Sequence, residues 1–338
     1  MEPVTHFLFG ACLGRAGFNR KTALATATMT LAAEAPDLDV FARFAGPAAG
    51  LEHHRGFTHS FLGGVLVAVV VVAFMYGVWR MRGRKTKSSL PPRWGLLFVL
   101  AYLAVLTHIL LDFTNNYGVR PFWPLSEKWY SWDIVFVIEP VMLVLLLAGL
   151  VLPALGSLIS EEIGARRKGP KGRLAAILAL AAVVLMWAVR DYEHRRALIA
   201  LNARTYEGVD AIRVSAFPYM GNPFHWYAVA ETESSFATME VDSLTPDVDP
   251  QGRMRVFYKP QETPATLAAK ASYMGRVYLD WAAYPVVESE QLSQGWIVHF
   301  KDLRYDYPGR RRPPLSAEVE LDTNLRVTGE FMGPRGSR

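Results

Sequence analysis

The sequence predicts an α-helical integral membrane domain over residues 1–204 and a β-rich, sandwich-like domain over residues 205–338, on the outer side of the membrane. The chain is 51% hydrophobic and only 20% charged, whereas an ordinary soluble domain is about 25% charged. Long apolar runs fill the first part, and short alternating runs fill the second. The net charge changes at the same boundary. Up to residue 204, 22 basic and 13 acidic residues give a net charge of +9, and after it 14 basic and 18 acidic residues give −4.

The membrane domain is predicted to begin with a hairpin of two short helices. Its apolar parts, 4–14 and 22–33, are each too short to cross a bilayer, which takes about 20 residues. A polar stretch from Gly17 to Lys21 separates them. A re-entrant or partly inserted hairpin fits, because neighbouring helices can cover its backbone. Glu2 and the absence of a basic start argue against a cleaved signal peptide.

About four transmembrane helices are expected after the hairpin. The apolar segments are 60–79, 94–111, 134–160 and the shorter 174–189. Basic residues cluster after the first segment and before the fourth: Arg80, Arg82, Arg84, Lys85, Lys87 and Arg93, and then Arg166, Arg167, Lys168, Lys171 and Arg173. Because basic loops stay in the cytoplasm, residues 33–59, residues 113–133 and everything after Arg190 are expected on the outer side. This pattern explains the basic charge without a nucleic-acid partner.

Alternating runs after residue 204 predict antiparallel strands. They include DAIRVSAF, FHWYAVAE, GRMRVFY, GRVYLDWA, GWIVHF and SAEVELDTNLRVTGEF, separated by Pro, Gly, Asn and Asp. A sandwich is the favoured packing, and the pattern leaves a barrel or mixed packing open. His225 and His299 lie in these runs and are interpreted as ordinary strand histidines. The basic run 310–312 is interpreted as a solvated loop.

Histidines and aspartates gather in the first 112 residues, and this is the main functional signal. His108 and Asp112 stand four residues apart in the second apolar segment, so both lie on one helix face. Imidazole and carboxylate suit Zn²⁺, and also Mn²⁺ or Fe²⁺. The structural alternative is a buried histidine bonded to a carboxylate one turn away. Membrane placement favours a site, because ionisable groups are costly in a spanning helix. A lone Cys12 leaves histidines and carboxylates as ligands.

Two more clusters precede the first apolar segment. The motif APDLD places Asp37 and Asp39 two residues apart, where they bridge one ion if the backbone turns, or form a turn or helix cap. The motif HHRGFTHS gathers polar side chains just before the span: His53, His54, Arg55, Thr58, His59 and Ser60. A hairpin with a cytoplasmic turn returns His6 to the same side. All clusters are therefore expected at one membrane face.

Taken in order, His6, PDLD, HRGFTHS and YLAVLTHILLDFTNNYG resemble the motifs of the YdjM family of bacterial inner-membrane proteins, described as metal-dependent hydrolases. More distantly, their order is similar to that in the zinc-dependent phospholipase C and P1-nuclease group, helical enzymes that cleave phosphoesters. The resemblance implicates these residues: His6, Asp37, Asp39, His54, His59, His108 and Asp112. The resemblance does not distinguish the metal ligands from the catalytic base. The chain lacks a clear second HxxxD/E helix, which puts a full trinuclear centre in doubt.

These assignments predict a membrane-bound hydrolase that cleaves a lipid-linked or other membrane-associated ester, with a phosphoester favoured. One or two divalent ions, zinc first, would activate a water. The metal ligands assigned are His6, Asp37, His54, His59, His108 and Asp112. Asp39 or Asp37 is assigned to orient the water. Arg55 is assigned to hold a phosphate, and contact with lipid headgroups is an equal alternative.

Other polar and aromatic residues are secondary candidates. The aromatic residues Trp123, Trp129, Tyr130 and Trp132 are interpreted as an interfacial belt, with substrate stacking as the minority reading. Asp133 and Glu139 follow them. Glu139 lies in an apolar segment and needs a partner, so it either lines the same cavity or bonds another helix.

Two other functions compete with hydrolysis. In a non-catalytic membrane protein, the metal would organise the helices and the β domain would bind an envelope partner. A metal or proton transporter needs a relay of ionisable groups through the membrane, whereas here they gather at one side. We expect membrane lipids as partners and a multi-pass location in the bacterial inner membrane, with the C-terminal domain outside the cytoplasm.

Overall fold

The computed structural model describes residues 1–84, 90–162, 172–309 and 314–333, and it divides into two compact units. The first unit comprises Met1–Asp39 and Arg55–Asp191, and the second comprises Val40–His54 and Tyr192–Arg338. The chain thus leaves the first unit after Asp39 and returns to it at Arg55. Several basic residues of the sequence prediction lie outside the described residues: Lys85, Lys87, Arg166, Arg167, Lys168, Lys171, Arg310, Arg311 and Arg312.

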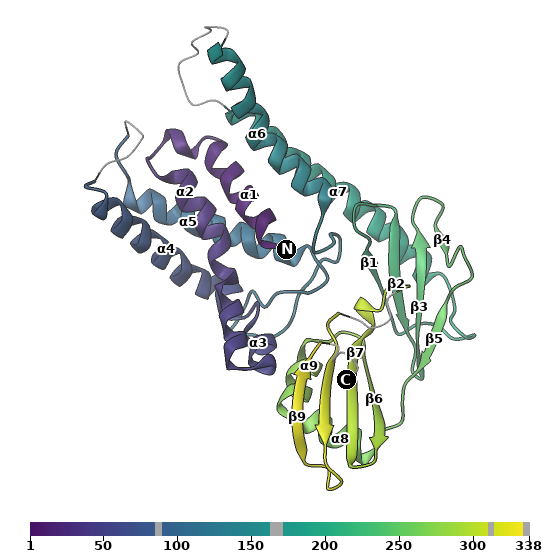
Figure 1. Cartoon of the computed structure of the whole chain (residues 1–338). Coiled ribbons are helices and arrows are strands. Elements are labelled where there is room, and N and C mark those ends of the chain that lie inside the picture. The colour runs from purple at the N-terminus through teal and green to yellow at the C-terminus, as the bar shows by residue number, and fades with distance from the viewer. Residues whose placement is uncertain (85–89, 163–171, 310–313, 334–338) are drawn as a thin grey trace. The chain divides into compact units, whose positions relative to one another are not determined.

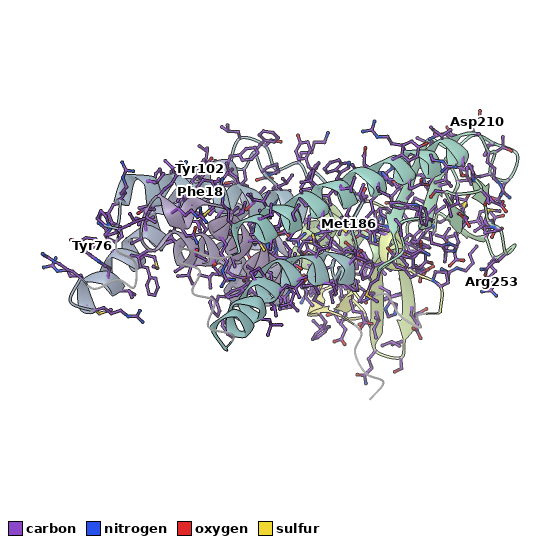
Figure 2. The ribbon with its side chains drawn as sticks, turned by 90° about the horizontal axis from the view of Figure 1, so that it is seen from above. Phe18, Tyr76, Tyr102, Met186, Asp210 and Arg253 are labelled. Atoms are coloured by element: carbon purple, nitrogen blue, oxygen red, sulfur yellow. The ribbon has the colours of Figure 1, made fainter. Side chains whose placement is uncertain are left out.

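Helices build the first unit (Figure 1). They are α1 (Pro3–Arg15), α2 (Ala25–Glu34), α4 (Phe61–Met81), α5 (Trp94–Phe113), α6 (Pro140–Glu162) and the first part of α7 (Arg173–Asn202). Three short 3-10 segments connect the early helices: η1 (Phe18–Arg20), η2 (Ala35–Ala45) and η3 (Phe57–His59). The tyrosines Tyr76 and Tyr102, labelled in Figure 2, mark α4 and α5.

Three helices among the described residues are long and apolar enough to cross a membrane, namely α4, α5 and α7. The third predicted span forms α6, whose described apolar part, Pro140–Gly156, is shorter. The reason lies before Pro140. Residues 134–139 are not helical, and the amides of Ile134 and Val135 donate to the carbonyl of Thr114, each at 3.0 Å. The predicted span thus begins with an extended piece that belongs to the loop.

Two glycines let α1 and α2 pack closely as the predicted hairpin. A Cβ on Gly10 would lie 2.7 Å from the Cβ of Ala33, and one on Gly14 would lie 2.5 Å from the Cα of Thr26. Both distances are far shorter than van der Waals contact, so the approach requires glycine. Their spacing of four residues puts both on one face of α1, an arrangement that brings membrane helices together.

Among the described residues, two apolar cores hold the first unit together. One is shared by α2, α4 and α5 and includes Met29, Val71 and Leu100. The other joins α1 and the end of α5 to α6 and α7, and it includes Cys12 and Leu111. Helix α5 contributes to both cores, which makes it the central support of this unit.

The second unit contains two antiparallel sheets (Figure 1). The five-stranded sheet has the order β1-β2-β3-β4, with β5 also paired to β3, and the four-stranded sheet has the order β6-β7-β8-β9. Strand bounds are β1 (Arg213–Pro218), β2 (His225–Glu231), β3 (Ser235–Asp242), β4 (Asp247–Val248), β5 (Arg255–Tyr258), β6 (Pro285–Leu292), β7 (Gly295–Asp302), β8 (Ala317–Leu321) and β9 (Val327–Met332). His225 lies in β2 and His299 in β7. The short η4 (Leu303–Tyr305) follows β7.

One predicted strand is wrong. The run GRVYLDWA forms most of helix α9 (Tyr273–Trp281), which follows α8 (Pro264–Ala271) and covers the second sheet with it (Figure 1). Met274, Tyr278 and Trp281 are buried, and their spacing is helical rather than alternating. The hydroxyl of Ser272 caps the helix by accepting from the amide of Gly275 at 3.1 Å.

Helix α3 (Pro47–His53) belongs to the second unit although it precedes all other elements of that unit in sequence. It packs against α9 and β9. The phenol of Tyr273 donates a hydrogen bond to the carboxylate of Glu52. The segment between the two early clusters of polar residues is therefore held by elements made from the end of the chain.

Candidate metal centre

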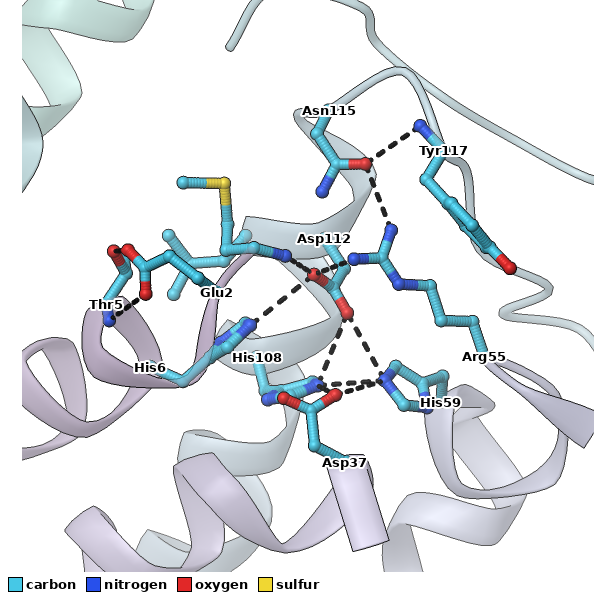
Figure 3. Close-up of polar contacts among 12 residues, drawn as sticks. Glu2, Thr5, His6, Asp37, Arg55, His59, His108, Asp112, Asn115 and Tyr117 are labelled. Carbon is cyan, nitrogen blue, oxygen red and sulfur yellow. Dashed lines mark hydrogen bonds and ion pairs between the residues drawn. The ribbon is translucent and has the colours of Figure 1, made fainter. Parts of the chain in front are cut away.

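Four separate elements bring five of the predicted site residues together (Figure 3). His108 and Asp112 lie one turn apart near the end of α5. His59 ends η3, immediately before Ser60 caps α4 through the amide of Gly63. Asp37 lies in η2, which turns the chain after α2, and His6 projects from α1.

Four of these residues offer one ligand atom each to a common point. The ligand atoms of Asp37, His59, His108 and Asp112 all lie within 4.8 Å of one another. His59 Nε2 is 2.9 Å from His108 Nε2, 3.2 Å from Asp112 Oδ2 and 3.4 Å from Asp37 Oδ1. His108 Nε2 is 3.4 Å from Asp112 Oδ2 and 3.6 Å from Asp37 Oδ1.

These separations suit a small divalent ion. In tetrahedral coordination with bonds of about 2.0–2.1 Å, two ligand atoms lie about 3.3 Å apart. Five of the six edges of the group are given above, and they lie between 2.9 and 3.6 Å. Two nitrogen and two oxygen donors match the ligands of zinc, manganese and iron. The four residues therefore fit a metal ion both by chemistry and by spacing.

The second nitrogen of each histidine is held by an acceptor. His108 Nδ1 is 2.6 Å from the carbonyl oxygen of Ala33, to which it donates. His59 Nδ1 is 3.1 Å from Asp39 Oδ2 and 3.0 Å from the hydroxyl of Thr58. Such contacts fix the ring and leave Nε2 as the ligand atom, as in known metal sites. Asp39 thus lies behind His59 rather than in the four-residue group.

His6 gives independent support for a ligand at this centre. Its ring is fully buried and stacks on His108 with ring centroids 3.8 Å apart. Neither ring nitrogen has a hydrogen-bond partner among the described residues, although Nε2 lies 3.4 Å from Asp112 Oδ1. Buried polar atoms without partners are rare and call for an explanation such as an ion. Asp112 Oδ1 also accepts from the amino group of Met1.

Arg55 is placed beside the ligand carboxylate. Its Nη2 donates to Asp112 Oδ1 at 2.8 Å, and its Nη1 donates to Asn115 at 3.0 Å and to the carbonyl of Gly118 at 3.3 Å. Its guanidinium also lies 4.7 Å from the ring centroid of Tyr117. The Nε–H of Arg55 has no acceptor among the described residues. This buried donor is therefore unused within the described part of the chain.

The electrostatics of the centre favour positive charge. Burial by itself would lower the pKa of His59, but hydrogen bonds with Asp112, Asp37 and Asp39 raise it to about 10. For Asp37, burial raises the pKa, whereas the hydrogen bond with His59 and the charge of His108 hold it below its ordinary value. Asp37 is 21% exposed and the other three ligand side chains are fully buried. Asp37 is thus the ligand residue of this group that is partly exposed.

Other predicted residues lie outside this group. His53 and His54 belong to the second unit, and neither is among the four ligand residues. Glu139 accepts from Arg190 Nη2 at 2.6 Å, which is the helix-bonding alternative of the sequence interpretation. Asp133 follows Trp132 in the loop, where the indole of Trp132 donates to Asp191 at 2.8 Å.

Three contributors to the centre escaped prediction. The carbonyl of Ala33 could not be predicted as an acceptor, because every residue has a backbone carbonyl. The amino group of Met1 could not be predicted either, because residue types say nothing about it. Asn115 belongs to the motif DFTNNYG, so its polar side chain is visible in the sequence, but only the structure shows its contact with Arg55.

Comparison with known proteins supports one family. The family model described as "YdjM inner membrane protein" matches residues 1–197. The chain is 24% identical over 342 residues to "Uncharacterized protein YfhP" of Bacillus subtilis (strain 168), a match that covers 98% of this chain and 95% of that protein. No solved structure gives a significant match.

Proposed function

This chain belongs to the YdjM inner membrane protein family, and from that premise we propose that it is a membrane-bound, metal-dependent hydrolase that cleaves a membrane-associated phosphoester. One observation carries the proposal: Asp37, His59, His108 and Asp112 converge within 4.8 Å, three of them buried and one partly exposed. A purely structural ion needs no exposed ligand. An access point at Asp37 is what a reacting water and a substrate require.

A divalent ion held by these four residues would supply an activated water and polarise a phosphoryl oxygen, provided that its coordination expands to five to admit the water. The chain's own groups prepare the rest. Asp39 and the carbonyl of Ala33 orient the two imidazoles. Arg55, whose Nε–H is unused among the described residues, is proposed to take a phosphate oxygen once the substrate enters, which would add a charge-assisted bond. Asp37, ionised and partly exposed, is the group proposed to orient the attacking water, with the carboxylate oxygen that does not hold the ion.

The position of the site supports a substrate at the membrane surface. His59 lies two residues before α4 begins, and Asp112 lies in the last turn of α5. Both helices are candidate spans, so the centre lies at one end of each. The arginines at the other ends are Arg80 in the last turn of α4, Arg82 and Arg84 after it, and Arg93 before α5. By the positive-inside tendency, the centre belongs to the outer face.

Purified full-length protein tests the proposal. We would strip it with a chelator, reload it with Zn²⁺, Mn²⁺ or Fe²⁺, and follow hydrolysis of bis(p-nitrophenyl) phosphate and of phospholipids in nanodiscs. The expected result is turnover that chelation abolishes, that metal restores and that Asp112→Asn lacks. The proposal would be overturned if the wild-type protein binds its ion fully but hydrolyses none of these esters. That result would leave the non-catalytic alternative, in which the metal organises the helices.

A further inference from the structure

A second feature of the first unit is an apolar groove of about 400 Å³ beside α5. Its lining includes Phe61, Leu106, Ile109, Leu110, Phe122 and Tyr130. Ile109 follows His108 by one residue, which turns it by about 100° around the helix axis. The groove therefore lies on a different face of α5 from the ligand residues, and the metal centre does not account for it.

Three aromatic rings frame the groove. Phe61 and Phe122 pack edge to face with centroids 5.4 Å apart, and Phe122 and Tyr130 do the same at 5.5 Å. The amide of Phe61 donates to the carbonyl of Pro121 at 2.9 Å, which ties the start of α4 to the loop after α5. The groove is thus built by two helices and one loop that are fixed to each other, as expected of a preformed ligand site.

The surroundings identify the occupant. Leu110, Phe61 and Phe122 are 40%, 41% and 46% exposed, and they continue the apolar surface of α4 and α5. Because both helices are candidate spans, this surface faces lipid chains. At the rim, the ammonium of Lys128 lies 5.4 Å from the ring centroid of Tyr130. A hydrocarbon chain fits the groove, and the cation beside it selects a negative headgroup.

We propose that the groove binds one acyl chain of an anionic glycerophospholipid, with the lipid phosphate held by Lys128. The wall of this site is joined to the metal centre. Arg120 donates its amide to the carbonyl of Arg55 at 3.3 Å, and Arg55 Nη1 donates to the carbonyl of Gly118 at 3.3 Å. A bound lipid would pack on residues 119–122, which belong to the same loop that holds Arg55 beside Asp112.

Native mass spectrometry tests the lipid site with phosphatidylglycerol and phosphatidylcholine as probes, offered in equal amounts to the full-length protein in mild detergent. We expect wild type to retain one phosphatidylglycerol molecule at least about 3-fold more than phosphatidylcholine, a difference that corresponds to at least about 0.7 kcal/mol. Leu110→Trp fills the groove and is expected to abolish retention. Lys128→Gln is expected to remove the headgroup preference.

Matched controls separate these effects from general damage. Val99→Trp adds the same side chain at a 58% exposed position of α5 that is not in the groove lining. Lys21→Gln removes another lysine that lies over a ring, that of Phe18. Equal retention of both lipids by wild type, or unchanged retention in Leu110→Trp, would overturn the proposal. Metal content, measured on the same samples, is expected to stay constant, so the result is independent of hydrolytic activity.

Discussion

The Nε2 atoms of His59 and His108 face each other at 2.9 Å, while the Nδ1 atoms of both rings are held by acceptors on the protein. Two imidazoles fixed in this way direct their remaining nitrogens at one point between Asp37 and Asp112. A proton can occupy that point, and a divalent ion satisfies all four groups at once. The predictions below begin from this arrangement.

Removal of one ligand should empty the centre. We expect His108→Ala and Asp112→Asn to bind metal with an affinity about 100-fold lower or weaker still, because each ligand supplies a direct bond to the ion. The purified variants should therefore contain little metal. Elemental mass spectrometry of the purified protein measures this. His225→Ala, a histidine in β2 of the second unit, is the matched control and should keep wild-type metal. Full metal occupancy in Asp112→Asn would show that the ion lies elsewhere in the protein.

Asp39 should act through His59. Asp39→Asn keeps the shape of the side chain but weakens the acceptor behind Nδ1, so we expect about 10- to 100-fold lower metal affinity with folding retained. A competition titration against a fluorescent chelator gives the affinity. Asp39 also accepts the backbone amide of Arg55 at 2.8 Å, and Asp242 in the second unit accepts that of Leu244 at 2.9 Å. Asp242→Asn is therefore the matched control and should have no effect. If the two variants bind metal equally well, Asp39 is only a loop residue.

Close packing of the hairpin should be required for the centre. Gly10→Val places a side chain where Ala33 lies 2.7 Å away, and Ala33 holds His108. We expect α1 and α2 to separate, with loss of metal and a lower melting temperature. Gly77→Val, at a glycine of α4 with open space around it, should leave both unchanged. A metal-replete Gly10→Val protein would contradict the link between hairpin and centre.

The buried ion pair of Glu139 and Arg190 should stabilise the first unit without serving the metal. Glu139→Gln leaves a buried guanidinium without its charge partner, which costs about 3–5 kcal/mol. Thermal unfolding in detergent should show the loss, with metal binding kept at low temperature. The double variant Glu139→Gln and Arg190→Met should recover much of the stability. Lys270→Met, which breaks an exposed pair with Glu262, should cost less than about 1 kcal/mol.

Topology gives a prediction of a different kind. Three candidate spans and the basic residues beside α4 and α5 place the C-terminal unit outside the cytoplasm if α6 also crosses. Alkaline phosphatase fused after Arg338 should then be active in cells, and a fusion after Arg84 should be inactive. The reverse pattern would move the centre to the cytoplasmic face and remove the argument for an outer substrate.

Sequence patterns predicted the parts of this site that depend on local spacing. His108 and Asp112 follow from the helical repeat, and the hairpin follows from two short apolar runs. The contact between Asp37 and His59 depends on the 3-10 segments η2 and η3, and no periodic pattern in the sequence predicts these. The contact of His108 with Ala33 is made by a backbone carbonyl, and carbonyls are the same in every residue.

The same distinction explains the error in the C-terminal unit. The run GRVYLDWA contains residues that favour strands, and it was grouped with the alternating runs between turn residues that predict strands. Helix α9 is instead specified by its ends and its partners: Ser272 caps it, and Met274, Tyr278 and Trp281 pack on one side. The capping serine was visible in the sequence, whereas the surface on which the helix packs was not.

The early insertion of residues 40–54 into the C-terminal unit has a consequence for biosynthesis. The ribosome releases α3 well before α9 and β9, its packing partners, exist. At about 5–20 residues per second, the nascent helix waits on the order of ten seconds or more. During that time its small apolar face, Ala48, Ala49 and Leu51, is uncovered. If translation stops before α9 is made, this apolar face stays uncovered. The segment that carries it leads directly to Asp39 at one end and to Arg55 at the other.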